Sequence, residues 1–164
     1  MTRFDSHPNV TEISVKDKPK ENDVRHCLEL NIMKQDNMRD YYPPLLRLSE
    51  IAVAKYQKDV TGIIFPEQIA CEQFRLNEYR TGQDHFTYHV AVNSAAATRR
   101  FLVMSWFLND VEQGGDVFFP HFNVRVQPKK GRLLVYPAAW MYPCSYETPL
   151  SNDKYVLGTY MHYL

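Results

Sequence analysis

The spacing of apolar residues divides the chain into one helical segment and a long run of strand-like segments. In "DYYPPLLRLSEIAVAKYQKDV", apolar positions from Leu45 to Tyr56 recur at intervals of three and four. Two prolines stand where a first helical turn tolerates them. This spacing predicts a helix over about 43–60, with an apolar stripe that covers one face of a sheet. From about residue 71 the period changes to two, which predicts strands.

Seven segments carry the strand pattern, and an eighth is expected in "PCSYET". The seven are "EQFRLNEYR", "HFTYHVAVN", "RFLVMSWFLN", "DVFFP", "NVRVQP", "RLLVYP" and "KYVLGTYMHY". Turn signals such as "TGQD" and "PKKG" separate them. A helix followed by about eight short strands predicts a mainly β fold with a supporting α-helix. Among such folds we expect a double-stranded β-helix, the jelly roll of cupin-like proteins.

The first 24 residues differ from the rest because they are polar and rich in lysine. We expect residues 1–24 to form an N-terminal arm with one short strand at most, which a binding partner would order. Residues 25–164 then make up a single jelly-roll domain. A chain of 164 residues is long enough to bury one sizeable core.

Composition and charge narrow the function classes. Lysine and arginine number 19, and aspartate and glutamate also 19, so the chain lacks the basic character of nucleic-acid-binding proteins. The N-terminus has no apolar stretch typical of a signal peptide, and no apolar run could span a bilayer. The cysteines Cys27, Cys71 and Cys144 are isolated and odd in number, which argues against a disulfide framework. We therefore expect a cytoplasmic or virion-associated protein, neither secreted nor membrane-bound.

The stretch "HFTYHVAVN" is the strongest candidate for chemistry. Strict alternation places His85, Thr87, His89 and Ala91 on one face of a strand, toward the barrel mouth. The other face is apolar and should pack under the helix. A His-x-carboxylate pair on such a strand supplies two ligands to ferrous iron, and a distant histidine completes the facial triad. Only His89 of that pair is present.

Four segments between Glu72 and Tyr163 carry a family resemblance. They are "YRTGQDHFTYHV", "RRFLVMSWFLNDVEQGGDVFFP", "VQPKKGRLLVYPAAWMYP" and "TPLSNDKYVLGTYMHY". In this order and spacing, the chain resembles the iron(II)- and 2-oxoglutarate-dependent oxygenases of the prolyl 4-hydroxylase-like group, including short forms from phage and bacterial genomes. Each segment alone is weak, but their order over more than half of the chain makes the resemblance specific.

The resemblance implies a cofactor site with two recognisable residues. Tyr79 matches the tyrosine that lies near the tail of 2-oxoglutarate in such proteins. Lys154 matches the basic residue that pairs with the distal carboxylate of 2-oxoglutarate. A cation is needed at such a position because a buried carboxylate is costly without a charged partner.

The resemblance also implies an iron site, but here the match is incomplete. His89 corresponds to the first metal ligand. Ala91 stands where the family has its metal-binding aspartate. Cys144, or Ser145 if the register slips by one residue, stands where the family has its distal histidine. Two of the three iron ligands are thus replaced.

Other residues could in principle rebuild a metal site. His85 lies four residues from His89, about 13 Å along a strand, which is too far to share an ion. Cys144 with His89 would make a soft two-ligand site for zinc or copper, although a cysteine is more often a small buried apolar residue. His121 would have to swing toward the mouth, and is more often a loop histidine.

These positions favour a non-catalytic protein that has lost its iron ligands and acts as a structural, adaptor or binding module, with a virion component as one form of it. We expect protein partners or a homo-oligomer and no cofactor, nucleic acid or membrane. The alternative is an active hydroxylase of peptidyl proline or a related residue, with Fe(II) and 2-oxoglutarate as cofactors. A second alternative is a metal-free sensor of 2-oxoglutarate or another carboxylate that uses Lys154.

Overall fold

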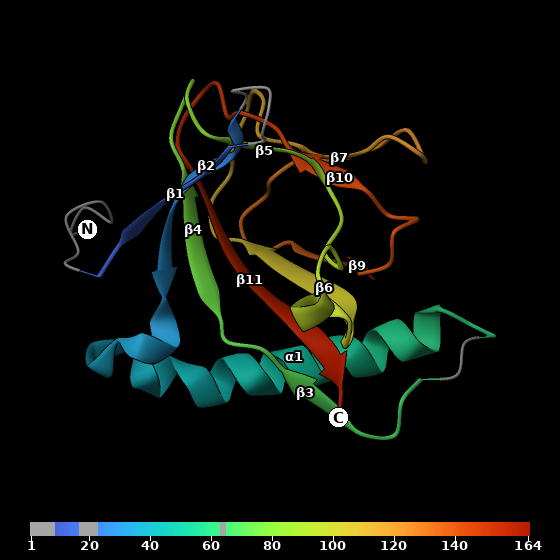
Figure 1. Cartoon of the computed structure of the whole chain (residues 1–164). Coiled ribbons are helices and arrows are strands. Elements are labelled where there is room, and N and C mark those ends of the chain that lie inside the picture. The colour runs from blue at the N-terminus through green and yellow to red at the C-terminus, as the bar shows by residue number, and fades with distance from the viewer. Residues whose placement is uncertain (1–8, 17–22, 63–64) are drawn as a thin grey trace.

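The computed structural model describes residues 9–16, 23–62 and 65–164, and this part of the chain forms one α-helix and eleven strands (Figure 1). The helix α1 (Tyr42–Asp59) follows two short 3-10 helices, η2 (Ile32–Lys34) and η3 (Asp36–Tyr41). A further 3-10 helix, η4 (Ala95–Ala97), precedes β6. The strands are β1 (Thr11–Lys16), β2 (Asp23–Asn31), β3 (Ile69–Cys71), β4 (Arg75–Tyr79), β5 (His85–His89), β6 (Arg100–Phe107), β7 (Val117–Phe119), β8 (Val124–Val126), β9 (Leu133–Pro137), β10 (Cys144–Tyr146) and β11 (Lys154–Tyr163).

The strands form a curved antiparallel sheet in the order β8-β7-β10-β5-β2-β4-β11-β6-β9. Beside this path, β1 pairs with β2 and β3 pairs with β11. Figure 1 shows β5, β7 and β10 lying across the interior from β6 and β9, so the sheet nearly closes on itself. This is the jelly roll, or double-stranded β-helix, and the predicted fold class is confirmed. Each of the eight predicted strand segments contains one strand, from β4 to β11.

The helix α1 begins and ends within one residue of its predicted bounds. It packs on the outer side of β6 and β11 through Val53, which contacts Leu102, Met104 and Met161. Its apolar stripe is narrower than the spacing predicts, because Leu48 and Ile51 are exposed. The other side of β6 and β11 faces the barrel interior, where the candidate site lies.

The sequence analysis expected no strand between the arm and the helix, and the structure has one there. β2 (Asp23–Asn31) pairs through its N-terminal half with β5 and through its C-terminal half with β4, so it joins the two halves of the barrel. Its alternation was obscured because Arg25 and Glu29 lie on one face of it. These two side chains are only partly exposed and bond to each other, which removes the cost of placing charges inside a strand.

The predicted arm contains β1, the one short strand expected there, and β1 pairs with β2 along six residues. Residues 1–8 and 17–22 of the arm lie outside the described part of the chain. No helix within the described ranges is both long and apolar enough to cross a membrane.

Candidate functional site

A β-bulge in β5 shapes the centre of the candidate site. Phe86 stands opposite Tyr146 of β10, and His89 stands opposite Cys144, so two residues of β5 face a single residue of β10. An extra residue of this kind shifts the alternation of the side chains beyond it. Phe86 and His89 therefore line the same interior cavity, and their rings stack with centroids 3.4 Å apart.

The bulge makes the predicted alternation of β5 wrong. Phe86 lines the interior instead of packing under α1, and Tyr88 is 59% exposed. His85 does not line the cavity with His89. A bulge leaves no mark in a period-two pattern, because the extra residue can be of any type. His89 and Ala91 do share the cavity wall, as predicted.

His89 is a neutral imidazole at neutral pH. Burial, with a smaller contribution from the positive charge of Arg25, lowers the pKa of His89 to about 4. Its Nδ1 lies 2.8 Å from the carbonyl oxygen of Thr87. A carbonyl only accepts hydrogen bonds, so Nδ1 carries the proton and Nε2 keeps its lone pair. His89 could thus supply one nitrogen ligand.

The other two positions of the expected triad offer no comparable donor. Ala91 has only a methyl group. Cys144, rather than Ser145, is the residue directly opposite His89. Its thiol is buried and lies 3.3 Å from the hydroxyl oxygen of Tyr136. Burial raises the pKa of the Cys144 thiol to about 11, which disfavours the thiolate form that binds metals.

No other side chains complete a metal site in the ranges that the structure describes. His121 is exposed, with its Nδ1 3.3 Å from the carbonyl oxygen of Met141, and it does not line the cavity. No group of three or more histidine, cysteine, aspartate or glutamate side chains is close enough to hold an ion in this part of the chain. The described donors therefore do not make a facial triad.

Lys154 and Tyr79 lie together, as register partners on β11 and β4. The Lys154 ammonium is fully buried and donates to the carbonyl oxygens of Gly115 and Glu147 at 2.8 and 3.1 Å. Its Nζ lies 4.5 Å from the centre of the Tyr79 ring and 5.5 Å from that of Tyr146. Burial lowers the pKa of Lys154 to about 7. Backbone and aromatic groups thus surround the charge.

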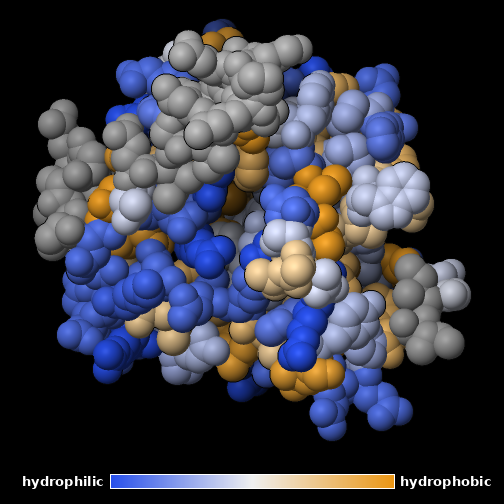
Figure 2. Space-filling view, viewed as in Figure 1, coloured by the Kyte–Doolittle hydropathy of each residue, from blue (hydrophilic) through white to orange (hydrophobic). Residues whose placement is uncertain are grey.

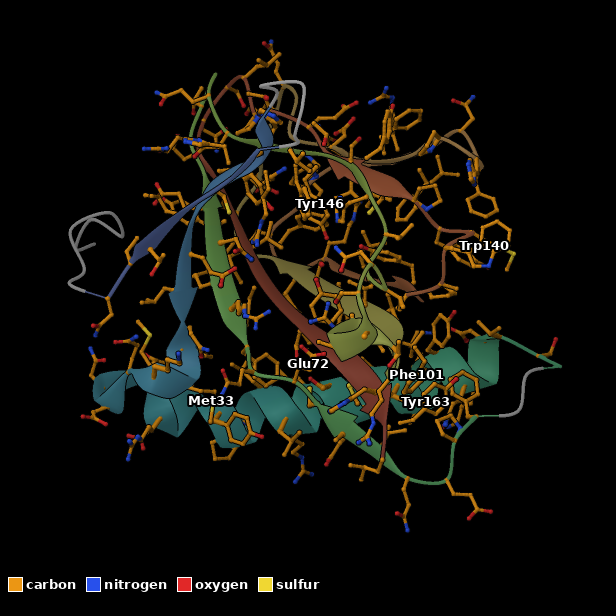
Figure 3. All side chains as sticks on the ribbon, in the orientation of Figure 1. Met33, Glu72, Phe101, Trp140, Tyr146 and Tyr163 are labelled. Atoms are coloured by element: carbon orange, nitrogen blue, oxygen red, sulfur yellow. The ribbon has the colours of Figure 1, made fainter. Side chains whose placement is uncertain are left out.

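A small cavity remains inside the barrel between these groups. Its volume is about 70 Å³, and its wall includes Tyr79, His89, Ala91 and Tyr146. Figure 3 shows Tyr146 in the interior enclosed by the strands. The Tyr146 ring stacks on that of Tyr79 with centroids 5.9 Å apart, and its hydroxyl lies 2.9 Å from that of Ser105. A cavity of this size holds only a few heavy atoms.

The sequence analysis missed Arg25, which also lines this cavity. Its Nη2 donates to Glu29 Oε2 at 3.0 Å and to Asn77 Oδ1 at 2.9 Å. Its guanidinium carbon lies 5.2 Å from the centre of the Phe86 ring. Arg25 precedes the region of family resemblance. The available signal was the alternation of Val24, His26, Leu28 and Leu30 around it.

Comparison with solved structures identifies the class of fold. A prolyl hydroxylase from Trichoplax adhaerens, in complex with a hypoxia inducible factor peptide fragment, superimposes with a TM-score of 0.72 and 13% identity, over 94% of this chain and 71% of that one. The viral collagen prolyl hydroxylase of Paramecium bursaria Chlorella virus-1 gives 0.69 and 12%, over 86% and 81%. A Pseudomonas putida prolyl-4-hydroxylase gives 0.59 and 19%, over 86% and 74%. No protein-family profile and no curated protein matches the sequence.

The fold is therefore that of the prolyl 4-hydroxylase-like oxygenases that depend on 2-oxoglutarate and Fe(II), and the resemblance predicted from the sequence is confirmed. At these low identities the likeness is one of fold. What the chain does depends on its own site residues.

Proposed function

We propose that this protein is a non-catalytic binding or structural module built on a prolyl 4-hydroxylase-like fold. The observation that carries the proposal is the set of groups at the expected iron position: one imidazole, one methyl group and one buried thiol, from His89, Ala91 and Cys144. A non-haem Fe(II) oxygenase needs two histidines and a carboxylate there. A single neutral imidazole holds ferrous iron too weakly for catalysis.

The surroundings of Lys154 also support the proposal. In an oxygenase this cation would pair with a carboxylate of 2-oxoglutarate. Here its ammonium already donates to the carbonyl oxygens of Gly115 and Glu147. The cavity of about 70 Å³ is smaller than the cavity of roughly 150 Å³ that admits benzene, and 2-oxoglutarate has more heavy atoms than benzene. Cofactor binding would therefore require side chains to move.

An exposed apolar patch supports a role in contacts with other proteins. The patch consists of Phe122, Trp140 and Met141, and Trp140 is 72% exposed. The loops that carry Phe122 and Met141 meet, because Phe122 stacks on Tyr142 with centroids 5.1 Å apart and His121 Nδ1 lies 3.3 Å from the carbonyl oxygen of Met141. Aromatic residues and methionine are enriched in protein interfaces. Such a patch suits an adaptor or a component of a larger assembly such as a virion.

The test is ferrous binding and 2-oxoglutarate turnover by the purified protein. Anaerobic titration calorimetry with Fe(II), with and without 2-oxoglutarate, should give no stoichiometric binding. Aerobic incubation with both should release no more succinate than heat-denatured protein does. An active prolyl hydroxylase of the same fold is the positive control in both assays.

Stoichiometric iron binding, or succinate release that depends on iron, would contradict the proposal. The His89→Ala variant then shows whether the iron sits at the expected position, because removing the one imidazole should abolish the signal.

The second candidate function is an active 2-oxoglutarate-dependent hydroxylase. The observation that favours it is the pairing of Lys154 with Tyr79, which keeps the two residues implied in cofactor binding side by side. This candidate requires iron ligands other than those described, and it predicts succinate release in the same assay. Binding of 2-oxoglutarate without iron would instead favour the metal-free sensor.

A further inference from the structure

The inner surface of the cavity contains a buried donor that no described residue satisfies. Arg25 reaches the cavity from β2, and its Nη2 has two acceptors, Glu29 and Asn77. Its Nε is also buried, but no hydrogen-bond acceptor reaches it among the described residues. Buried donors in native proteins nearly always have a partner, so an unpaired one indicates a bound water or ion.

The charges on the cavity wall favour an anion as that partner. Among the described residues that line the cavity, the arginine and carboxylate side chains are Arg25, Arg75 and Glu29. Both guanidinium groups share the same carboxylate, with Arg75 Nε 3.6 Å from Glu29 Oε1 and Arg25 Nη2 3.0 Å from Glu29 Oε2. One positive charge is therefore left without a counter-charge on the wall. In a partly enclosed site that charge attracts an anion strongly.

The size and lining of the cavity limit the kind of anion. A volume of about 70 Å³ admits a group of a few heavy atoms, since one water needs about 10–15 Å³ of such cavity volume. The side chains of Phe86, Ala91, Val103 and Val156 make part of the wall apolar. That surface suits a short alkyl group better than the fully hydrated oxygens of phosphate.

We infer that the barrel interior binds a small carboxylate with a short apolar tail, anchored by Arg25 and without a metal ion. The inference deepens the proposed non-catalytic binding role and rests on it, because a metal ion at His89 would compete with the guanidinium charge for the same space. The anchor is distinct from Lys154, whose ammonium the backbone already satisfies. On the face seen in Figure 2 hydrophilic residues predominate and apolar ones appear as scattered patches.

The unpaired Nε–H of Arg25 is itself the reporter for the experiment. Its ¹⁵N–¹H signal is followed at pH 7, in buffer with a chelator, while sodium acetate is added at constant ionic strength. The signal should move downfield and saturate, because the N–H gains an acceptor. Arg100 is the internal control, since its Nε already donates to Glu72 Oε1 at 2.6 Å and should not shift. Sodium chloride and sodium phosphate should leave the Arg25 signal in place.

Two variants locate the site. Arg25→Met assigns the signal and should weaken acetate binding, measured by calorimetry, at least tenfold. Ala91→Leu fills the cavity without changing any charge, and should abolish the acetate-dependent shift while the Arg25 signal remains visible. It also keeps the inference testable if Arg25→Met does not fold. Arg125→Met, on the half-exposed pair with Glu147, is the matched control and should bind acetate like the wild type.

A wild-type Arg25 signal that does not saturate with acetate would overturn the inference. So would an equal response to chloride, or a response that survives in Ala91→Leu. Because the buffer contains a chelator and no 2-oxoglutarate, these outcomes leave the proposed absence of catalysis intact. That proposal fails separately, through iron-dependent release of succinate.

Discussion

Two buried cations, Lys154 and Arg25, differ in how the chain satisfies them. The Lys154 ammonium has two backbone carbonyl acceptors and two aromatic rings around it. Arg25 has two acceptors on Nη2 but none for its buried Nε in the described part of the chain. The described residues therefore satisfy the Lys154 ammonium, whereas the Arg25 Nε–H remains available to a ligand.

The difference separates the residue that matches the family motif from the residue that has an unpaired donor. Lys154 is the residue that the family resemblance assigns to the cofactor, yet its hydrogen bonds are internal and it acts as a structural tie between Gly115 and Glu147. Arg25 has no role in the resemblance, yet it has the unpaired donor. A buried donor that the chain leaves unpaired is stronger evidence for a ligand than a match to a motif, because an unpaired group costs about 1–3 kcal/mol.

The largest expected effect is the loss of stability when the buried Lys154 side chain and its two hydrogen bonds are removed. Lys154→Ala removes the packed stem and leaves two buried carbonyl groups without a donor, so the free energy of unfolding should fall by about 3–4 kcal/mol. Lys154→Met is the matched control because it keeps most of the stem volume while leaving the same two carbonyl groups without a donor, and it should cost about 1–3 kcal/mol. Urea denaturation measures both. Equal losses in the two variants would show that the stem does not contribute to the tie.

The next largest effect is expected at the other side of the cavity. Ala91→Asp with Cys144→His restores the three donor types that ferrous iron requires, and should raise the affinity for Fe(II) at least 100-fold over the wild type in anaerobic calorimetry. Cys144 stands directly opposite His89, so an imidazole at position 144 would lie on the neighbouring strand beside the existing one. Ala91→Asp with Ser145→His is the control. If that control gained iron instead, the distal position would be Ser145.

Most of the strands could be predicted from the sequence. The β-bulge and strand β2 could not, and each has a physical reason. Period-two alternation located every strand from β4 to β11, because each has one face in the interior. Lys154 and Tyr79, which the family resemblance assigns to one cofactor site, are register partners, and their role in cofactor binding stays a prediction. The bulge that turns Phe86 inward could not be predicted, since an extra residue has no compositional signal. β2 was missed because Arg25 and Glu29 interrupt its apolar pattern in the sequence. Their ion pair, which makes these charges tolerable in a strand, forms only in the folded chain.

A smaller effect is expected in the pH dependence of stability. Burial lowers the pKa of Lys154 from its ordinary 10.5 to about 7. Between these two values the unfolded chain holds the proton that the folded chain has lost, so this group makes stability rise with pH, by at most about 1.4 kcal/mol per unit. Below pH 7 both states are protonated and the contribution is constant. Urea denaturation of the wild type and of Lys154→Met from pH 6 to 9 measures this contribution as the difference between their free energies of unfolding. A difference between the two proteins that stays flat above pH 7 would contradict a lowered pKa.

The smallest effect should come from the second guanidinium on the same carboxylate. Arg75 is 37% exposed and its Nε lies 3.6 Å from Glu29 Oε1, whereas Arg25 is better buried and 3.0 Å from Glu29 Oε2. Exposed ion pairs contribute little, so Arg75→Met should change the free energy of unfolding by about 0.5 kcal/mol or less. Arg25→Met should cost about 1–2 kcal/mol, since Asn77 and Glu29 both lose a buried donor. Addition of acetate sharpens the contrast, because it should stabilise the Arg75→Met protein and leave Arg25→Met unchanged. Equal costs for the two variants, measured by urea denaturation, would mean that burial does not distinguish Arg25 and that the unpaired donor is solvated.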